Sequence, residues 1–370
     1  MKNEERDSWR SFSQKPGHGR ATLRRSHASD VVPKRQLRKL LFEFLSFGLG
    51  RSDFGLRTSN YTFIDYATQG YILLVALIIL VLHGTAVPDW KWRIATHWGV
   101  VGLVHLLIAW HARRPANRLL DFLRHSYPIL LYVWLYGESG ELNQMLFRGY
   151  LDAYFLRLEQ AFFGWQPGIE LMYRFPARLV SEVLYAAYFS YYFMIGGIGL
   201  ALLLRDRRQF AHYISVVSFV FYACYLTYIF VPVVGPRILC DNIVPNPPLD
   251  AIGLLAPPGV PDSVAAAVFY RLMAFIYDHF ETPGAAFPSS HVAVAIVTVY
   301  FSFLYLRRIR WLHLAVAVML CVATIYGRYH YVADILAGGV TAAALIPAGN
   351  WLYRRFGGPA AADRHAPRPV

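Results

Sequence analysis

The stretch YILLVALIILVL at residues 71–82 contains only apolar residues and decides the class of fold. It lies inside a longer apolar run, 64–87, and about 20 apolar residues are enough for a helix to cross a bilayer. Seven further apolar runs follow it. The sequence therefore predicts an all-α protein, a polytopic membrane bundle of about eight spans, at 64–87, 94–110, 127–137, 179–204, 210–234, 291–306, 311–326 and 331–353.

The composition of the 370 residues supports this class. Hydrophobic residues make up 56% of the chain and charged residues only 16%, against about 25% charged in an ordinary soluble domain. This excludes a disordered chain and a simple cytosolic enzyme. The chain has only 3 cysteines, too few for a disulfide scaffold.

The formal net charge of +13 raises the question of a nucleic-acid partner. However, residues 1–39 carry 11 Lys and Arg against 4 Asp and Glu, so much of the charge lies in one tail. A basic tail next to membrane spans is typical of a segment that faces anionic lipids. We therefore expect no nucleic acid, a mostly disordered cytoplasmic tail at 1–60, and a surface helix at 37–49.

Beyond the tail, four regions are expected. These are N-terminal spans at 61–137, an interfacial amphipathic segment at 138–178, a catalytic membrane core at 179–354, and a cytoplasmic tail at 355–370. With the N-terminus inside and one crossing per run, 27 of the 36 Lys and Arg fall on the inner side, as the positive-inside rule favours. This predicts a multi-pass plasma (inner) membrane protein with both termini cytoplasmic. The short run at 127–137 needs 119–125 to reach across; if it is re-entrant, the N-terminal half is reversed.

Three polar segments fall on the outer side in this topology: GPR at 235–237, PSSH at 288–291 and RYHYVAD at 328–334. Together they bring two His, two Arg, two Ser and one Asp to one membrane face. Ionisable residues at span ends that face a shared cavity are candidates for a functional site.

The PSSH segment has the pattern of a helix start, because Pro suits the first turn and Ser is a favoured cap. Free N–H groups there, around Ser289 and Ser290, form an anion site, and His291 stands beside it. The alternative is an ordinary helix start with an incidental histidine.

In the third segment, His330 and Asp334 are four residues apart and share a helix face. A carboxylate can hold one imidazole nitrogen as N–H and leave the other as a lone pair, as a nucleophilic or basic histidine needs. The alternative is a pair that merely satisfies its own hydrogen bonds. Arg237 and Arg328 are suited to clamp a phosphate, or else reach toward lipid head groups.

The succession GPR, FPSSH and RYHYVADILAG resembles the type 2 phosphatidic acid phosphatase superfamily. The likeness is closer to its branch with inositol phosphorylceramide synthases, which are inositolphosphotransferases. It covers 235–338, with a compatible core from 179 to 353 and a looser likeness upstream through LDAYFLRLEQAFFGWQP.

The resemblance implies a helical bundle of the six-helix phosphatase type with an outward-facing phosphate site and neither metal nor cofactor. It implies that His330 is the nucleophile that forms a phosphohistidine, Asp334 its orienting carboxylate and His291 the acid that protonates the leaving oxygen. Arg237 and the amides of Ser289 and Ser290 would form the phosphate clamp. Electrostatic clamping of this kind carries much of the rate of phosphoryl transfer.

Two positions depart from the better-known members of the superfamily. Where they carry a Lys, seven residues before the clamp Arg, this chain has Phe230. Where they carry an Arg, six residues before the nucleophile, it has Thr324. Arg328 is a candidate substitute. Both departures favour the phosphotransferase-like branch over a standard phosphatidate phosphatase.

The leading hypothesis is a membrane enzyme of lipid metabolism that transfers a phosphoryl group from a lipid phosphate or phosphodiester. The acceptor is either water or a second alcohol, such as a polyol or a lipid alcohol. The alternative is a non-catalytic lipid-binding or transport protein on the same fold. Transport predicts polar residues near the middle of several spans, whereas here they gather at one face. Glu138 and Glu182 are weaker candidates, for binding a hydroxyl or pairing with Arg237.

Overall fold

Helices form the regular structure of the chain in the computed structural model, which describes residues 60–146, 148–240 and 259–356. All of them lie in the second of the two units into which the chain divides, Arg57–Val370. The surface helix expected at 37–49 therefore falls outside the described residues. The same holds for the two expected tails, except for residue 60 of the first and residues 355–356 of the second. No strand occurs in the described ranges, and one isolated bridge joins Val233 to Ala285.

The helices follow one another with short connections between most of them. They are α2 (Phe63–Leu82), α3 (Trp90–Arg113), α4 (Arg118–Leu142), α5 (Asp152–Phe163), α6 (Pro167–Arg174), α7 (Arg178–Arg205), α8 (Arg207–Phe230), α9 (Pro236–Cys240), α10 (Asp262–Ala265), α11 (Val268–Phe280), α12 (Ser290–Tyr305), α13 (Arg310–Tyr326) and α14 (Val332–Phe356).

Five of these helices are long and apolar enough to cross a membrane: α2, α3, α7, α8 and α14. Two more, α12 and α13, are apolar but shorter. The short predicted run at 127–137 lies within α4, which extends it to 25 residues but is not one of the five. The all-helical membrane class is thus supported, while the count of eight spans stays a prediction.

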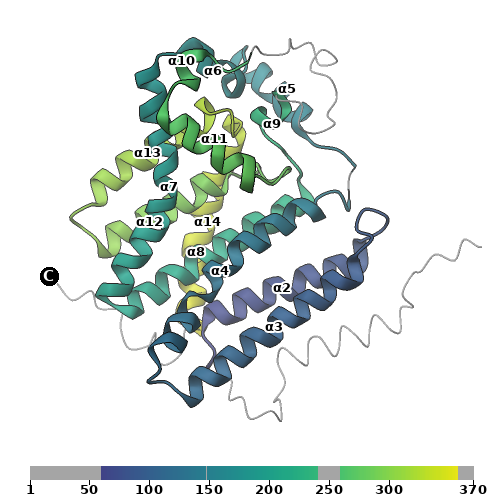
Figure 1. Ribbon diagram of the computed structural model, residues 1–370, viewed down its shortest axis with the longest axis vertical. Helices are drawn as coiled ribbons and strands as arrows, with labels where there is room; N and C mark the ends of the chain where they lie inside the picture. The colour runs from purple at the N-terminus through teal and green to yellow at the C-terminus, as the bar shows by residue number, and fades with distance from the viewer. Residues whose placement is uncertain (1–59, 147, 241–258, 357–370) are drawn as a thin grey trace, which may run out of the picture. The chain divides into compact units, whose positions relative to one another are not determined.

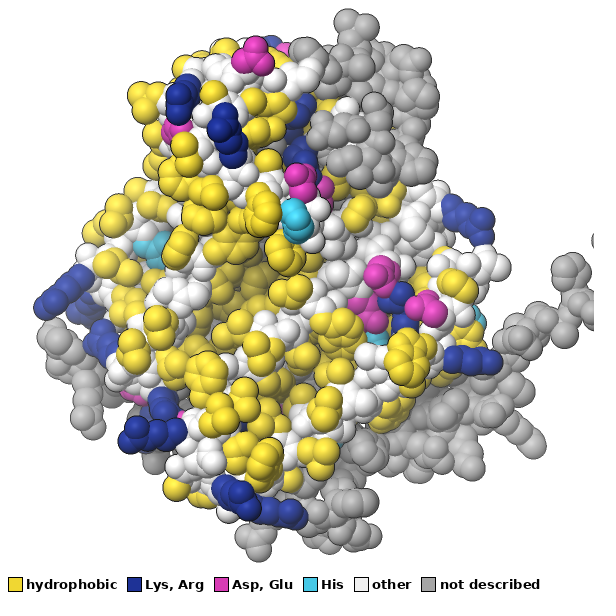
Figure 2. Space-filling view, in the orientation of Figure 1, with side chains coloured by type: hydrophobic (Ala, Val, Ile, Leu, Met, Phe, Trp, Pro, Cys, Tyr) yellow, Lys and Arg dark blue, Asp and Glu magenta, His cyan; other side chains and the backbone are white. Residues whose placement is uncertain are grey.

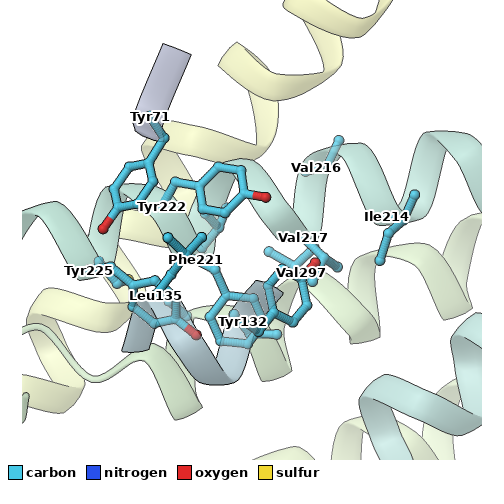
Figure 3. Close-up of a cluster of buried hydrophobic side chains, with 14 of the residues drawn as sticks. Tyr71, Tyr132, Leu135, Ile214, Val216, Val217, Phe221, Tyr222, Tyr225 and Val297 are labelled. Atoms are coloured by element: carbon cyan, nitrogen blue, oxygen red, sulfur yellow. The ribbon is translucent and has the colours of Figure 1, made fainter. Parts of the chain in front are cut away.

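The long helix α8 forms the centre of the bundle. In its most apolar window 72% of the residues are buried, against 22% for α3, and it packs against α2, α4, α7, α12 and α14. Figure 3 shows the core here, where Tyr71, Tyr132, Tyr222 and Val297 meet from four helices. Two of these buried phenols have hydrogen-bond partners: the hydroxyl of Tyr222 lies 2.9 Å from that of Thr68, and the hydroxyl of Tyr132 lies 2.6 Å from that of Ser218.

Side chains in the sequence set the helix ends. Asp206 ends α7 and caps α8, since its carboxylate accepts a hydrogen bond from the amide of Arg208. Ser289 caps α12, where its hydroxyl oxygen accepts from the amide of Val292 at 3.3 Å. These are the favoured cap residues. Gly164 ends α5 in the left-handed conformation, with φ of 74°, which glycine adopts without a steric penalty.

The outer surfaces of the long helices are apolar. Exposed leucine side chains project from α3, α4 and α7, among them Leu106, Leu130 and Leu204. Figure 2 shows hydrophobic side chains gathered over the middle of one face, with most Lys and Arg nearer its rims. A soluble protein rarely exposes so much contiguous apolar surface, and a membrane-embedded one needs it.

The short helices gather at one end of the long ones (Figure 1). Here α6 packs on α13, α11 on α7, and α5 on α14. The segment leading into α9 also pairs with the segment leading into α12, because the amide of Ala286 donates to the carbonyl of Val233 at 2.8 Å. This end of the molecule contains all three polar segments singled out in the sequence.

Candidate active site

Backbone hydrogen bonds join the three polar segments into one site. The amide of Ser289 at the start of α12 donates to the carbonyl of Asp334 in the first turn of α14, at 3.0 Å. The amide of Arg237 in α9 donates to the carbonyl of Arg328 at 2.6 Å. The sequence prediction that these segments meet is therefore matched by their positions in the fold.

The two histidines and the aspartate form a continuous chain. Nδ1 of His330 lies 3.2 Å from Oδ2 of Asp334, which also accepts from the amide of Tyr331 at 2.9 Å. Nε2 of His330 lies 3.3 Å from Nδ1 of His291. An ionised Asp334 only accepts, so in the ionised pair the proton on His330 lies at Nδ1, and its Nε2 is a lone pair. The hydrogen between the histidines then belongs to Nδ1 of His291.

Burial keeps the side chains of His330 and Asp334 away from water. Only 3% of His330 and none of Asp334 is exposed. Removal from water disfavours the charged imidazolium, and this lowers the pKa of His330 to about 3. His330 is therefore neutral at neutral pH, with the lone pair that nucleophilic attack requires.

The two candidate clamp arginines lie in different surroundings. Arg237 forms an ion pair with Glu281, which follows α11, and its guanidinium stands 4.9 Å from the ring centre of Tyr277. Arg328 is buried, has a positive φ of 63°, and donates to the hydroxyl of Tyr173 at 3.2 Å. Both belong to the site end, and their contacts fix the side chains on the protein before any phosphate arrives.

The sequence predicts free backbone amides at Ser289 and Ser290, but in the structure both amides have hydrogen-bond partners. The amide of Ser289 is bonded to Asp334, as described above. The amide of Ser290 faces the hydroxyl of Tyr228 at 3.3 Å. An anion at this helix start must therefore compete with bonds inside the protein, and the role of these amides in a phosphate clamp stays a prediction.

A buried carboxylate that was not predicted from the sequence, Asp152, connects two of the three segments. One oxygen of Asp152, at the start of α5, accepts from the amide of Gly235 and from the hydroxyl of Tyr331, both at 2.9 Å. The other accepts from the amide of Val234 at 3.0 Å. Asp152 is 1% exposed, and burial raises its pKa. It holds the GPR segment against the connection between α13 and α14, residues 327–331, which contains His330 and is called the histidine loop below.

A second buried carboxylate, Glu159, lies two turns further along α5. Its carboxylate accepts a hydrogen bond from the amide of Val332 at 2.6 Å. Val332 is the first residue of α14, next to the histidine loop. Burial raises its pKa to about 7. Gly168 of α6 passes beneath the same loop: a β-carbon there would lie 3.2 Å from the carbonyl oxygen of His330. Helices α5 and α6 thus support the loop closely.

Two glutamates considered from the sequence lie elsewhere. Glu182 accepts from the amides of Val268 and Phe269 and so caps α11. Glu138 lies 3.3 Å from Nε2 of His97 on α3. The carboxylate recorded beside Arg237 is Glu281, which the sequence analysis did not single out. No group of three or more His, Cys, Asp or Glu side chains is placed to hold a metal ion in the described part of the chain.

One signal for the missed carboxylates was present in the sequence. Asp152 and Glu159 are seven residues apart, so on a helix they share a face with Phe155 and Leu156, which are buried. Acidic residues on the apolar face of a helix need internal partners. Nothing local in the sequence marks Glu281, because its partner is 44 residues away.

Fold and site together define a helical membrane protein with a pair of neighbouring histidines, of which the buried one, His330, contacts an aspartate. Residues 153–348 match the model of the PAP2 superfamily, and the chain belongs to it. Comparisons with curated proteins and with solved structures found no match. Members of this superfamily are generally phosphatases, which supports an enzyme with a phosphatase-type function.

Proposed function

We propose that the protein is an integral membrane enzyme that transfers a phosphoryl group from a lipid phosphate or phosphodiester through a phosphohistidine. The observation that carries the proposal is the chain from Asp334 through His330 to His291, because it gives each ring nitrogen a defined proton state. Such an arrangement suits a nucleophile oriented by a carboxylate and paired with an acid.

In the first half of the reaction, Nε2 of His330 attacks phosphorus. A nitrogen–phosphorus bond forms, the bond from phosphorus to the leaving oxygen breaks, and that oxygen takes the proton from Nδ1 of His291. In the second half, water or an alcohol attacks the phosphohistidine. Its proton returns to Nδ1 of His291, and His330 leaves as the neutral imidazole, still held by Asp334.

The acceptor decides between two outcomes. Water makes the protein a lipid phosphate phosphatase, and an alcohol makes it a head-group phosphotransferase similar to inositol phosphorylceramide synthases. We propose the second. Phe230 and Thr324 replace the additional cations of standard phosphatases, and the site is buried, which disfavours free access of water.

The proposed location is the extracytoplasmic face of the plasma membrane, with both termini in the cytoplasm. It rests on the distribution of Lys and Arg over the connections between spans. Arg307→Cys and Ala266→Cys, each introduced into a chain in which Cys224, Cys240 and Cys321 are replaced by Ala, test it with an impermeant thiol reagent on intact cells. The second should react and the first should not; the opposite result would put the site on the cytoplasmic side.

The enzyme mechanism is tested with the purified full chain and lipids labelled in the phosphate. We expect a phosphoprotein that is stable in base and labile in acid. We also expect turnover that survives chelators and is blocked by vanadate. Adding inositol or a lipid alcohol distinguishes transfer from hydrolysis through the lipid product identified by mass spectrometry. A chain that neither forms the adduct nor changes any lipid would contradict the proposal.

A further inference from the structure

The proton supply of His291 is incomplete if this residue acts alone. In the chain described above, Nδ1 of His291 carries a hydrogen and Nε2 is a lone pair. A neutral imidazole that gives up its single N–H becomes an imidazolate, which is a very unfavourable product. A second proton must therefore arrive at Nε2 before or while the first departs from Nδ1.

The structure places a hydroxyl at that nitrogen. The phenol of Tyr188 in α7 lies 3.0 Å from Nε2 of His291. Because Nε2 accepts in the resting state, the hydroxyl of Tyr188 must donate to it. The side chain of Tyr188 is fully buried, and its ring stacks on Tyr329 at 4.6 Å between centres. Its position beside the histidine is therefore fixed by packing.

A second phenol continues the chain away from the active site. The hydroxyl of Tyr277 in α11 contacts the hydroxyl of Tyr188. Since Tyr188 donates to His291, its oxygen accepts here and Tyr277 donates. Tyr277 also stacks on Tyr329, at 4.3 Å. Tyr277 keeps part of its surface exposed, as His291 does, whereas Tyr188 between them is fully buried, so the row of hydroxyls ends at a partly exposed side chain on the short helix α11.

We infer that Tyr277 and Tyr188 form a proton relay for His291 that enters on the ring nitrogen opposite the substrate. This inference rests on the proposed function and deepens it. A hydronium ion of the solvent gives a proton to the oxygen of Tyr277 and becomes water, the hydroxyl proton of Tyr277 passes to Tyr188, and that of Tyr188 passes to Nε2. His291 then gives its Nδ1 proton to the leaving oxygen and returns to the neutral state, now protonated at Nε2.

The same row of hydroxyls runs in reverse in the second half of the reaction. The attacking water or alcohol gives its proton to Nδ1 of His291, which has become a lone pair. The proton on Nε2 returns to Tyr188, one leaves Tyr188 for Tyr277, and one leaves Tyr277 for water. One proton enters and one leaves in each turnover, so the histidine and both phenols return to their starting state.

The test compares leaving groups in Tyr188→Phe, which keeps the ring and removes the hydroxyl. The probes are dioctanoyl phosphatidate, whose alkoxide needs a proton to leave, and 4-nitrophenyl phosphate, whose phenolate does not. We expect turnover of phosphatidate to fall about 10- to 100-fold, part of the usual effect of a general acid. Turnover of the nitrophenyl ester should change less than about threefold. Tyr277→Phe should follow the same pattern more weakly.

Tyr213→Phe is the matched control, because it removes another buried phenol whose hydroxyl donates to the carbonyl of Ile195 at 2.9 Å. It should leave the ratio of the two substrates unchanged. An equal loss on both substrates in Tyr188→Phe, or no loss on either, would overturn the relay while leaving the phosphohistidine mechanism intact. Absence of turnover and of phosphoenzyme in the wild type would overturn the proposed function, and the relay with it.

Discussion

Helix α13 has a buried histidine near each end, and the two differ in what their ring nitrogens contact. His313, in its first turn, lies 3.1 Å from the hydroxyl of Thr298 and 2.5 Å from that of Ser302. His330, just beyond its last turn, faces Asp334 and His291. Each hydroxyl can turn its one proton to His313 or to a backbone carbonyl, Thr298 to that of Ala295 and Ser302 to that of Thr298. Either tautomer of His313 can therefore find a partner, whereas an ionised carboxylate selects the tautomer of His330. Burial alone therefore does not make a histidine reactive; the group that its ring nitrogen contacts determines which nitrogen has a free lone pair.

The largest difference is expected when each of the two histidines is replaced by alanine. His330→Ala should lower turnover by at least about 10³-fold and abolish the phosphoprotein, as the loss of a nucleophile does. His313→Ala should keep turnover within about tenfold. It should reduce stability by about 1–3 kcal/mol, because two buried hydroxyls lose a partner. The measurements are steady-state turnover, adduct formation and thermal unfolding in detergent. Similar losses of turnover in both variants would remove the distinction.

A narrower change tests the carboxylate. Asp334→Asn keeps the shape of the side chain but places an amide where His330 needs an acceptor, so the histidine turns to the wrong tautomer. We expect turnover to fall about 10²- to 10⁴-fold with little change in unfolding temperature. Ser302→Ala, which removes one partner of His313, is the control and should not change turnover. If Asp334→Asn were fully active, the tautomer argument would fail.

A smaller loss should follow from Asp152→Asn. The amide group cannot accept the hydrogen bonds that one carboxylate oxygen now receives, so the GPR segment and the histidine loop separate slightly. Misplacement of this size typically costs up to about 10²-fold in rate. Hydrogen exchange at the amides of Val234 and Gly235 should quicken in parallel. Glu170→Gln, which removes an acid from a half-exposed pair with Arg174, should alter neither quantity.

The smallest effect concerns the pH dependence of stability. Glu159 has a pKa raised to about 7 in the fold, from the ordinary 4.5. The folded state therefore binds more protons between these two values, and stability falls as the pH rises through this window. The slope from this group is at most about 1.4 kcal/mol per pH unit. Glu159→Gln should flatten the decline in unfolding temperature between pH 5 and 7, whereas an unchanged slope would contradict the assignment to Glu159.

Much of the bundle could be predicted from the sequence because long apolar runs indicate helices that cross a membrane. The start of α12 at Ser290 follows from a capping serine next to an apolar run. The pairing of His330 with Asp334 was predicted from helical spacing, but His330 lies in the turn before α14, and Asp334 reaches it from the first turn of that helix. Both features are local, so the chain near the residue determines them.

The supports of the site could not be found in this way, because they depend on contacts distant in the chain. Asp152 meets Tyr331 across 179 residues, and Tyr188 meets His291 across 103. Hydropathy gives no sign of either contact. The pattern of the segment containing Asp152 instead predicts an amphipathic helix at the membrane surface. That interpretation of 138–178 stays a prediction, but α5 buries two acids on the side that faces the site.

The position of Asp152 has a consequence for how the catalytic part of this chain is delimited. The region shared with the superfamily begins at residue 153, one position after the carboxylate that connects two of the three motifs. A shortened protein cut to residues 153–348 would keep both histidines and Asp334 and yet lose Asp152, together with helices α2 and α4 that pack against α8. Homology boundaries drawn by similarity alone would thus yield a fragment with all of its chemistry and a misaligned site.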